Sequence, residues 1–361
     1  MTTTSLKTPF HDWHEAHGGR LVDFAGWDMP VQYTTITEEH HAVRTAVGVF
    51  DIAHMGRLRF HGADACRFLD RLVTNDVVAL EVGQVRYALV CREDGGILDD
   101  VLVYRFEEDY LLVVNASNRM KILDWIEVQR DEFDVTVTDL TLDWAMVAIQ
   151  GPRSIDLVAT VTGSEVTAMG YYRCESGEVM GYPARISRTG YTGEDGFELI
   201  VPAEAAVALW ESLVKDGGVP CGLGCRDTLR LEAAMPLYGH ELDEETDPYT
   251  AGLGFAVKPD SAPFVGRGAV LAARDRDGRR QRVGLRLDGR RIAREGAEVV
   301  GDGAAVGLVT SGTFSPTLEA AIGMAYVDPA WAETGTSVEV DIRGKRTTAV
   351  VVDLPFYKRG R

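Results

Sequence analysis

The stretch GGILDDVLVY, residues 95–104, carries two consecutive aspartates, Asp99 and Asp100, inside an otherwise apolar run. Its apolar residues predict a β-strand, in which successive side chains point to opposite faces. A carboxylate buried in such a strand needs a partner or a raised pKa, because an unpaired buried charge costs several kcal/mol or more. Such a residue is usually kept for chemistry or for binding, although strand aspartates also cap turns or pair with arginines.

A second apolar run, residues 86–91, precedes this strand and predicts its antiparallel partner. Residues 93–96 between them read Glu-Asp-Gly-Gly, and Asp-Gly supplies the positive φ angles that hairpin turns need. With an even-length turn, Leu89 would lie opposite Asp100, and Tyr87 would lie diagonally from Asp100 on the same face. Tyr87 is therefore a candidate neighbour of the Asp100 carboxylate.

The composition is that of an ordinary soluble globular protein, with 361 residues, 45% hydrophobic and 25% charged, which suffices for two or three domains. The net charge of −18 opposes phosphate backbones and anionic lipids, so we expect neither nucleic acid nor a membrane as a partner. The arginine-rich segment 274–294 is a local exception. We expect it to be solvated, with an acidic partner protein as the alternative.

The five cysteines are odd in number and scattered, which indicates reduced thiols in a cytoplasmic protein rather than a disulfide framework. Cys221 and Cys225 have no second Cys or His pair to complete four ligands, so we expect no zinc there. His11, His14 and His17 recur at every third position, and we expect them to pack rather than to bind a metal. The chain starts without the apolar core of a signal peptide.

The pattern of secondary structure changes near residue 260. Before it, helical periods over 64–72, 117–132 and 203–215 alternate with strand-like runs, which predicts a mixed region with largely antiparallel sheets. After it, short β-type runs are separated by Gly, Asp and Pro, as in a small all-β barrel. We therefore predict an α+β fold with an α/β region over 1–265 and a C-terminal β-barrel over 282–361.

A glycine-rich turn at 188–196, with sequence RTGYTGEDG, leads into a second apolar strand with a buried carboxylate. Alternation places Glu198 on the face opposite to Phe197 and Leu199, so Glu198 repeats the situation of Asp100. An ion pair with an arginine is the alternative explanation. The glycines match neither a Walker motif nor a dinucleotide-binding motif.

The segment 225–234 predicts a helix on which Arg226 and Arg230 are i,i+4 neighbours. A guanidinium there can hold a carboxylate bidentately, either that of Glu198 or one from a ligand. The residues alone leave both uses open.

These segments together resemble the T-protein (aminomethyltransferase) family of the glycine cleavage system. The resemblance runs from end to end and is carried by the residues 14–33, 50–55, 95–103, 148–152, 188–198, 226–232, 237–239, 309–312 and 315–318.

The resemblance implies two interleaved α/β subdomains and a C-terminal barrel around a central folate channel. It implies that an aminomethyl group on the lipoyl arm of H-protein gives its methylene to tetrahydrofolate, with release of ammonia and formation of 5,10-methylenetetrahydrofolate. Carried over by position, Asp100 matches the catalytic aspartate. Folate contacts are implied for Tyr87, Tyr191, Glu198 and Arg226, and Asn115 is expected to help through backbone groups. No metal is expected.

The chain also departs from the habits of this family. Thr250 and Phe255 stand where members commonly carry an acidic residue and a tryptophan, and the tail after residue 355 is short.

Two other functions fit the same scaffold. One is a folate-dependent demethylase of a small methylated compound. The other is a non-catalytic folate-binding regulatory protein, whose relatives resemble KGCYxGQE where this chain reads RTGYTGED at 188–195, without the cysteine.

Overall fold

The structure is a computed structural model that describes residues 5–163 and 165–360. Contacts divide the chain into two compact units, each built from several segments. Unit 1 contains the chain up to Ala88 together with Asp100–Gly190 and Glu194–Arg226. Unit 2 contains Leu89–Asp99, Tyr191–Gly193 and the chain from Asp227 onward. Each unit combines segments that are distant in the sequence, so this division does not test a boundary at one place in the chain. The predicted boundary between residues 265 and 282 stays a prediction.

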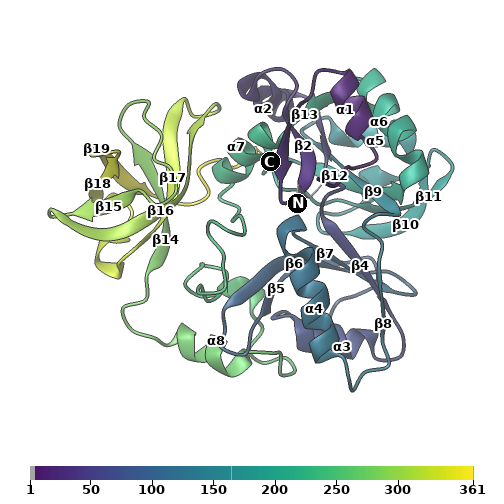
Figure 1. Cartoon of the computed structure of the whole chain (residues 1–361), viewed down its shortest axis with the longest axis horizontal. Helices are drawn as coiled ribbons and strands as arrows, with labels where there is room; N and C mark the ends of the chain where they lie inside the picture. Colours follow the sequence, from purple (N-terminus) through teal and green to yellow (C-terminus); the bar gives the residue numbers. More distant parts are fainter. Residues whose placement is uncertain (1–4, 164, 361) are drawn as a thin grey trace. The chain divides into compact units, whose positions relative to one another are not determined.

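The larger sheet of unit 1 has six strands in the order β10-β11-β12-β9-β3-β13 (Figure 1). Strands β3 and β13 run parallel, and the other four neighbouring pairs are antiparallel. The strands are β3 Gly48–Asp51, β9 Trp144–Gln150, β10 Cys174–Val179, β11 Tyr182–Ser187, β12 Gly196–Pro202 and β13 Val219–Cys221.

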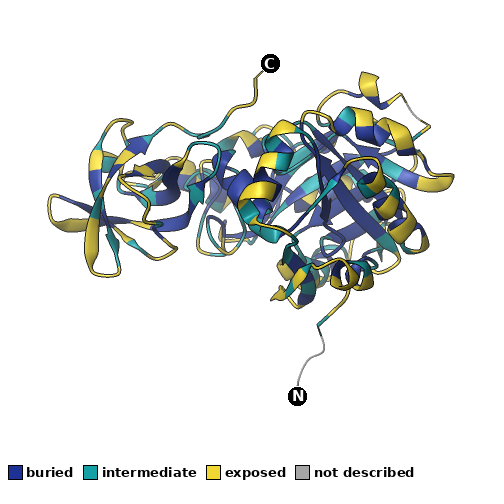
Figure 2. Ribbon diagram, turned by 90° about the horizontal axis from the view of Figure 1, so that it is seen from above, coloured by how far each residue is buried: buried dark blue, intermediate teal, exposed yellow. Residues whose placement is uncertain are grey.

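Helices α5 (Ser154–Val161) and α6 (Ala206–Lys215) cover this sheet through contacts with β9 (Figure 1). The core between them contains Phe197, Leu199 and Val201 from β12, and Leu209 and Trp210 from α6. Ile200, which was predicted to share the face of Glu198, is buried but does not belong to this core, as the predicted alternation of faces along the strand requires. Figure 2 shows that the sheet strands are buried while the helices keep exposed outer faces.

The second sheet has five strands in the order β5-β6-β7-β4-β8. These are β4 Gly56–His61, β5 Val85–Cys91, β6 Ile97–Arg105, β7 Tyr110–Val114 and β8 Thr136–Asp139. Helix α3 (Ala65–Leu72) buries Phe68, Leu69 and Leu72, and helix α4 (Arg119–Gln129) buries Ile122 and Ile126. The ring of Phe68 on α3 lies 6.2 Å from that of Phe60 on β4. Both helices were predicted from their apolar period.

The predicted hairpin between β5 and β6 is present, but its turn differs in length from the prediction. The Arg92 N–H donates to the Gly96 carbonyl over 2.9 Å, and the Gly95 N–H donates to the Arg92 carbonyl over 3.0 Å. Gly95 has φ +89°, a conformation that glycine adopts without strain. These bonds close an odd-length turn with a bulge at Gly95, so the even-length turn was wrong.

The N-terminal part of unit 1 adds α1 (His11–Ala16), the hairpin β1 (Arg20–Phe24) with β2 (Trp27–Gln32), and α2 (Ile36–Thr45). A capping box between Thr35 and Glu38 starts α2. His14 is fully buried. Its Nε2 is hydrogen-bonded to Asp51 Oδ2 over 3.0 Å, and its Nδ1 is hydrogen-bonded to Tyr33 Oη over 2.8 Å.

The C-terminal strands of unit 2 form a closed barrel in the order β14-β17-β16-β15-β18-β19 (Figure 1). They are β14 Gln281–Leu287, β15 Glu298–Gly301, β16 Ala304–Ser315, β17 Ala320–Val327, β18 Ser337–Ile342 and β19 Lys345–Val352. Its interior is filled by aliphatic side chains such as Leu285, Val309 and Val340. The predicted fold class, mixed α/β with antiparallel sheets and a C-terminal barrel, is confirmed.

The other helices of the described residues are distributed over both units. They are α7 Leu223–Glu232, α8 Arg267–Arg274 and the short 3-10 helices Ala116–Asn118, Val166–Ala168, Ala203–Ala205, Gly254–Ala256 and Pro329–Trp331. Within the described residues, no helix combines the length and apolar character needed to cross a membrane.

Leu199 tests the packing of α5 and α6 on the large sheet. Its side chain is fully buried in the core of unit 1, so Leu199→Ala should lower the free energy of unfolding by about 2–5 kcal/mol. Leu142→Ala is the matched control, because Leu142 is 58% exposed and its truncation should cost less than about 0.5 kcal/mol. Urea unfolding followed by intrinsic fluorescence measures both. Equal losses in the two variants would contradict this core.

Candidate functional site

Asp100 lies on β6, half-buried, with both carboxylate oxygens held by neutral donors. Tyr87 Oη donates to Asp100 Oδ2 over 3.1 Å, and Asn115 Nδ2 donates to Asp100 Oδ1 over 2.8 Å. The neighbouring Asp99 is fully buried. The structure thus brings Asp100, Tyr87 and Asn115 together in unit 1, as the sequence suggested for the first two.

Strand register explains why Asn115 reaches Asp100. Strands β6 and β7 pair Leu102 with Val113, and two further residues along each strand the same register sets Asn115 opposite Asp100. Asn115 was expected to act through backbone groups. In the structure its side-chain amide makes the contact, and it also donates to the Asp100 carbonyl over 3.2 Å.

Glu198 is the centre of a second polar cluster in unit 1, and only 6% of it is exposed. Thr189 Oγ1 donates to Glu198 Oε2 over 2.5 Å, and Tyr104 Oη donates to the same oxygen over 3.4 Å. Ser187 is the cross-strand neighbour of Glu198 and shares a 2.9 Å hydrogen bond with Thr189. Both donors bind Oε2, so Glu198 Oε1 has no hydrogen-bond partner among the described residues.

Burial raises the pKa of Glu198 above its ordinary value of 4.5, while the Thr189 hydroxyl and the charge of Arg226 lower it. Arg226 lies on α7 and is half-buried. Its electrostatic effect on Glu198 is consistent with the prediction that Arg226 is a partner of this carboxylate.

The phenol of Tyr172 is affected electrostatically by both carboxylates. Burial raises the pKa of its phenol above the ordinary value, and the charges of Glu198 and Asp100 raise it further. Both carboxylates therefore lie within electrostatic range of one phenol in unit 1.

His54 is a buried histidine in the same unit that the sequence did not single out. Its Nδ1 is inaccessible and has no hydrogen-bond partner within the described residues, and its ring meets that of Phe24 edge-on at 5.6 Å. Burial lowers its pKa to about 4, and the charges of Arg226 and Arg57 contribute to this. His54 is consequently neutral at physiological pH.

Tyr191, also expected at the site, belongs to unit 2. Its hydroxyl donates to the Pro236 carbonyl oxygen of that unit. In unit 2, Arg230 pairs with Glu241 over 2.9 Å and donates to Ser311 over 2.8 Å. The Tyr191 contact with folate stays a prediction.

The positions that depart from the family have structural roles in unit 2. Thr250 Oγ1 donates to Asp247 Oδ2 over 2.6 Å, and Phe255 is 65% exposed. The Tyr357 N–H in the tail donates to the Glu232 carbonyl over 2.8 Å.

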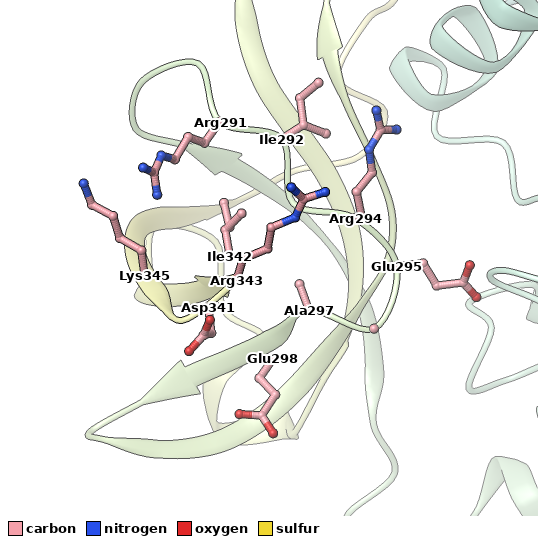
Figure 3. A pocket seen from close by; sticks show the side chains of 11 residues that line it. Arg291, Ile292, Arg294, Glu295, Ala297, Glu298, Asp341, Ile342, Arg343 and Lys345 are labelled. Carbon is pink, nitrogen blue, oxygen red and sulfur yellow. The ribbon is translucent and has the colours of Figure 1, made fainter.

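A cavity of about 860 Å³ opens on the barrel of unit 2. Charged side chains of both signs line it, among them Arg291, Arg294, Arg343, Lys345, Glu295 and Glu298 (Figure 3). The residues around it include none of the predicted site residues, so this cavity does not account for the Asp100 cluster.

No pattern in the sequence pointed directly to Thr189, Tyr104 or Tyr172. These residues act on Glu198 or Asp100 only after distant strands pair, and an isolated Thr or Tyr carries no motif. Thr189 was detectable only as part of the glycine-rich turn.

The geometry provides two oriented carboxylates with different surroundings. Asp100 is half-buried and accepts from a phenol and an amide, which fix the direction of its carboxylate. Glu198 is buried and offers Oε1 to a donor. Such a pair suits a ligand that presents several N–H groups.

Two family models cover most of the chain. The first, "GCVT N-terminal domain", matches residues 10–261, and the second, "Glycine cleavage T-protein C-terminal barrel domain", matches residues 280–358.

Curated relatives match over nearly the whole length. An aminomethyltransferase of Rubrobacter xylanophilus is 50% identical, with 99% of this chain and 96% of the relative covered. That of Cutibacterium acnes is 47% identical, with 99% and 100% covered. A crystal structure of glycine cleavage system aminomethyltransferase T from Bartonella henselae matches with a TM-score of 0.93 and 35% identity, over 98% of each chain.

Glu198 should make stability depend on pH. A folded pKa above the unfolded value stabilises the fold fully below about pH 4.5, and this contribution is lost as the pH rises through the folded pKa. Glu198→Gln removes the titration, so the free energy of unfolding of the wild type relative to this variant should fall as the pH rises above 4.5. Urea unfolding at several pH values measures the difference. Glu204→Gln, at an exposed glutamate, serves as control and should show a flat difference. A flat difference for Glu198→Gln would refute this assignment.

His54 should make the free energy of unfolding depend on pH in the opposite direction to Glu198. Its pKa falls from 6.5 to about 4 on folding, so its contribution to stability is complete above pH 6.5 and is lost as the pH falls toward 4. Relative to His54→Gln, the wild type should lose of order 3 kcal/mol across this window. The comparison uses urea unfolding, with the exposed His41→Gln as the matched control. A similar pH dependence in both comparisons would show that His54 is not the titrating group.

Proposed function

The chain belongs to the glycine cleavage T-protein family and is an aminomethyltransferase, and from this premise we propose that it transfers the methylene of an H-protein-bound aminomethyl group to tetrahydrofolate. The donor is the aminomethyl group on the lipoyl arm of H-protein, which is the proposed partner. The products are 5,10-methylenetetrahydrofolate, ammonia and the dihydrolipoyl carrier. The proposed setting is the cytoplasm.

The observation that carries this proposal is the fixed carboxylate of Asp100. The transfer replaces the C–S and C–N bonds of the aminomethyl carbon with bonds to folate N5 and N10. The two protons from N5 and N10 end on the lipoyl sulfur and on ammonia, so atoms balance. A carboxylate beside N10 is suited to orient that N–H and to take its proton as the second bond forms. Tyr87 and Asn115 keep the carboxylate in this direction without neutralising it.

Glu198 is the proposed recognition group for the pterin ring. Its open Oε1 can accept from the amino and ring N–H donors of the pterin, and burial makes such hydrogen bonds strong. Thr189 and Tyr104 hold the carboxylate, and Arg226 favours its charged form. Tyr191 is proposed as a further folate contact on the strength of the resemblance.

Much of the acceleration is expected to come from holding two bound reactants in place, and general base help adds about 10²- to 10⁴-fold. We propose no metal in this reaction, since proton transfer and positioning supply the chemistry.

Asp100→Asn keeps the size of the side chain and removes the base. This variant should form methylenetetrahydrofolate from aminomethylated H-protein about 10²- to 10⁴-fold more slowly, because the N10 proton has no acceptor. The assay scores ammonia and methylenetetrahydrofolate in the same reaction. Asp124→Asn, an exposed aspartate on α4, is the matched control and should keep the wild-type rate.

Wild-type rates in Asp100→Asn would remove Asp100 from the chemistry. Methylenetetrahydrofolate formed from a small methylated amine, but not from aminomethylated H-protein, would favour the demethylase. Folate binding without turnover of either donor would favour the regulatory protein.

A further inference from the structure

A network of buried hydrogen bonds in unit 2 surrounds the segment that follows α7, and Tyr191 is bonded to this segment. The centre of the network is the ion pair of Arg230 with Glu241, both of which are almost fully buried. A buried ion pair is costly unless further hydrogen bonds satisfy both groups. The other partners of Arg230 and Glu241 therefore show what the pair holds in place.

Arg230 uses all three nitrogens of its guanidinium. Its Nε donates to Asp227 Oδ1 over 2.8 Å, and its Nη2 donates to Ser311 Oγ on β16 over 2.8 Å. Its Nη1 donates to Glu241 Oε2 over 2.9 Å and to the Met235 carbonyl over 3.3 Å. A planar guanidinium holds several acceptors in one fixed geometry, which the single ammonium group of a lysine does not.

Glu241 is anchored to two strands of the barrel. Thr310 Oγ1 on β16 donates to Glu241 Oε1 over 2.5 Å, and Tyr326 Oη on β17 donates to the Glu241 carbonyl over 2.7 Å. Glu241 Oε2 accepts from the Leu237 N–H over 3.0 Å as well as from Arg230. Both carboxylate oxygens therefore have donors, as a buried charge requires.

These bonds fix the backbone on both sides of Pro236. The carbonyl before it accepts from Arg230, and the N–H after it donates to Glu241. The Pro236 carbonyl between them accepts the hydroxyl proton of Tyr191. A tyrosine hydroxyl has a single proton, so while this bond is present the Tyr191 oxygen can meet a ligand only as an acceptor. The direction of the Tyr191 hydroxyl thus depends on the Arg230–Glu241 pair.

The backbone around this contact is tightly fitted. Gly193, two residues after Tyr191, has φ +80°, and a Cβ at this position would lie 2.9 Å from the Cβ of Ala233. Ala234 has φ +55°, a conformation that residues other than glycine rarely adopt. Such strain persists only where the surroundings fix the backbone, and it is concentrated at functional sites.

We propose that Arg230 and Glu241 are positioning residues of the proposed reaction, which hold the hydroxyl of Tyr191 where it meets tetrahydrofolate. This inference rests on the proposed function, because it takes the folate contact of Tyr191 from there. The barrel takes part through Thr310 and Tyr326, which hold Glu241. Arg230 and Glu241 act through Tyr191 and not by touching the substrate.

Glu241→Gln keeps the shape of the side chain and removes its charge. With aminomethylated H-protein saturating, the KM for tetrahydrofolate should rise about 5- to 10-fold while kcat stays near that of the wild type, because Tyr191 is assigned to binding rather than to the chemical step. A merely structural defect would lower the active fraction, and hence kcat, without moving KM. Glu245→Gln, at an exposed glutamate, is the matched control and should keep the wild-type KM.

Thr310→Val is the second variant in case Glu241→Gln fails to fold, because it removes one donor to the Glu241 carboxylate and keeps the charge. It should raise the same KM by a smaller factor, whereas Thr348→Val, at an exposed threonine of the barrel, should not. Tyr191→Phe should raise the KM about as much as Glu241→Gln, and the double variant should not exceed the larger single effect. Additive effects would overturn the proposal.

A readout without folate separates the positioning role from the proposed function. In ligand-free protein labelled with carbon-13 at tyrosine Cζ, the Tyr191 signal is assigned with Tyr191→Phe. It should move in Glu241→Gln and in Thr310→Val and stay in place in the two controls. An unmoved signal or an unchanged KM in both variants would overturn the positioning role. Wild-type protein that transfers no methylene from aminomethylated H-protein would instead contradict the proposed function, whether or not the Tyr191 signal moves.

Discussion

The hydrogen bonds that hold the Asp100 carboxylate inside an apolar strand are the constraint on which the rest of this account depends. An ionised group between aliphatic neighbours is tolerated only if the fold supplies donors. Here Tyr87 on β5 and Asn115, the residue directly after β7, supply them from the two sides of β6. The five-stranded sheet thereby fixes the orientation of the Asp100 carboxylate.

Glu198, the second carboxylate, is also held by donors that the fold supplies, but its surroundings differ from those of Asp100. Glu198 is more deeply buried than Asp100, and its two donors, a threonine hydroxyl and a phenol, both bind one oxygen, whereas the phenol and the amide at Asp100 bind one oxygen each. Burial raises its pKa, and nearby groups offset part of that effect. One fold thus presents an accessible carboxylate suited to proton transfer and an enclosed one suited to recognition. The proposed division of roles follows from the different surroundings of the two carboxylates, since their side chains share the same chemistry.

The sequence predicted the features that depend on neighbouring residues better than those that depend on contacts between distant segments. Alternation along a strand is local, so the faces of Glu198 and its neighbours were predicted correctly. Tyr87 was predicted correctly as a neighbour of Asp100, although the turn was assigned the wrong length. Asn115, Thr189 and Glu241 depend on strand register and on packing between distant segments, and no local pattern shows that. The contacts of these residues became apparent only in the three-dimensional structure.

The most direct test of the central claim separates binding from chemistry in one variant. Tetrahydrofolate affinity and the single-turnover rate of methylene transfer are measured side by side for the wild type and for Asp100→Asn. The account predicts nearly unchanged affinity with a rate reduced about 10²-fold or more, since the base acts on the reacting nitrogen rather than on recognition. Weakened affinity together with an unchanged single-turnover rate would contradict it.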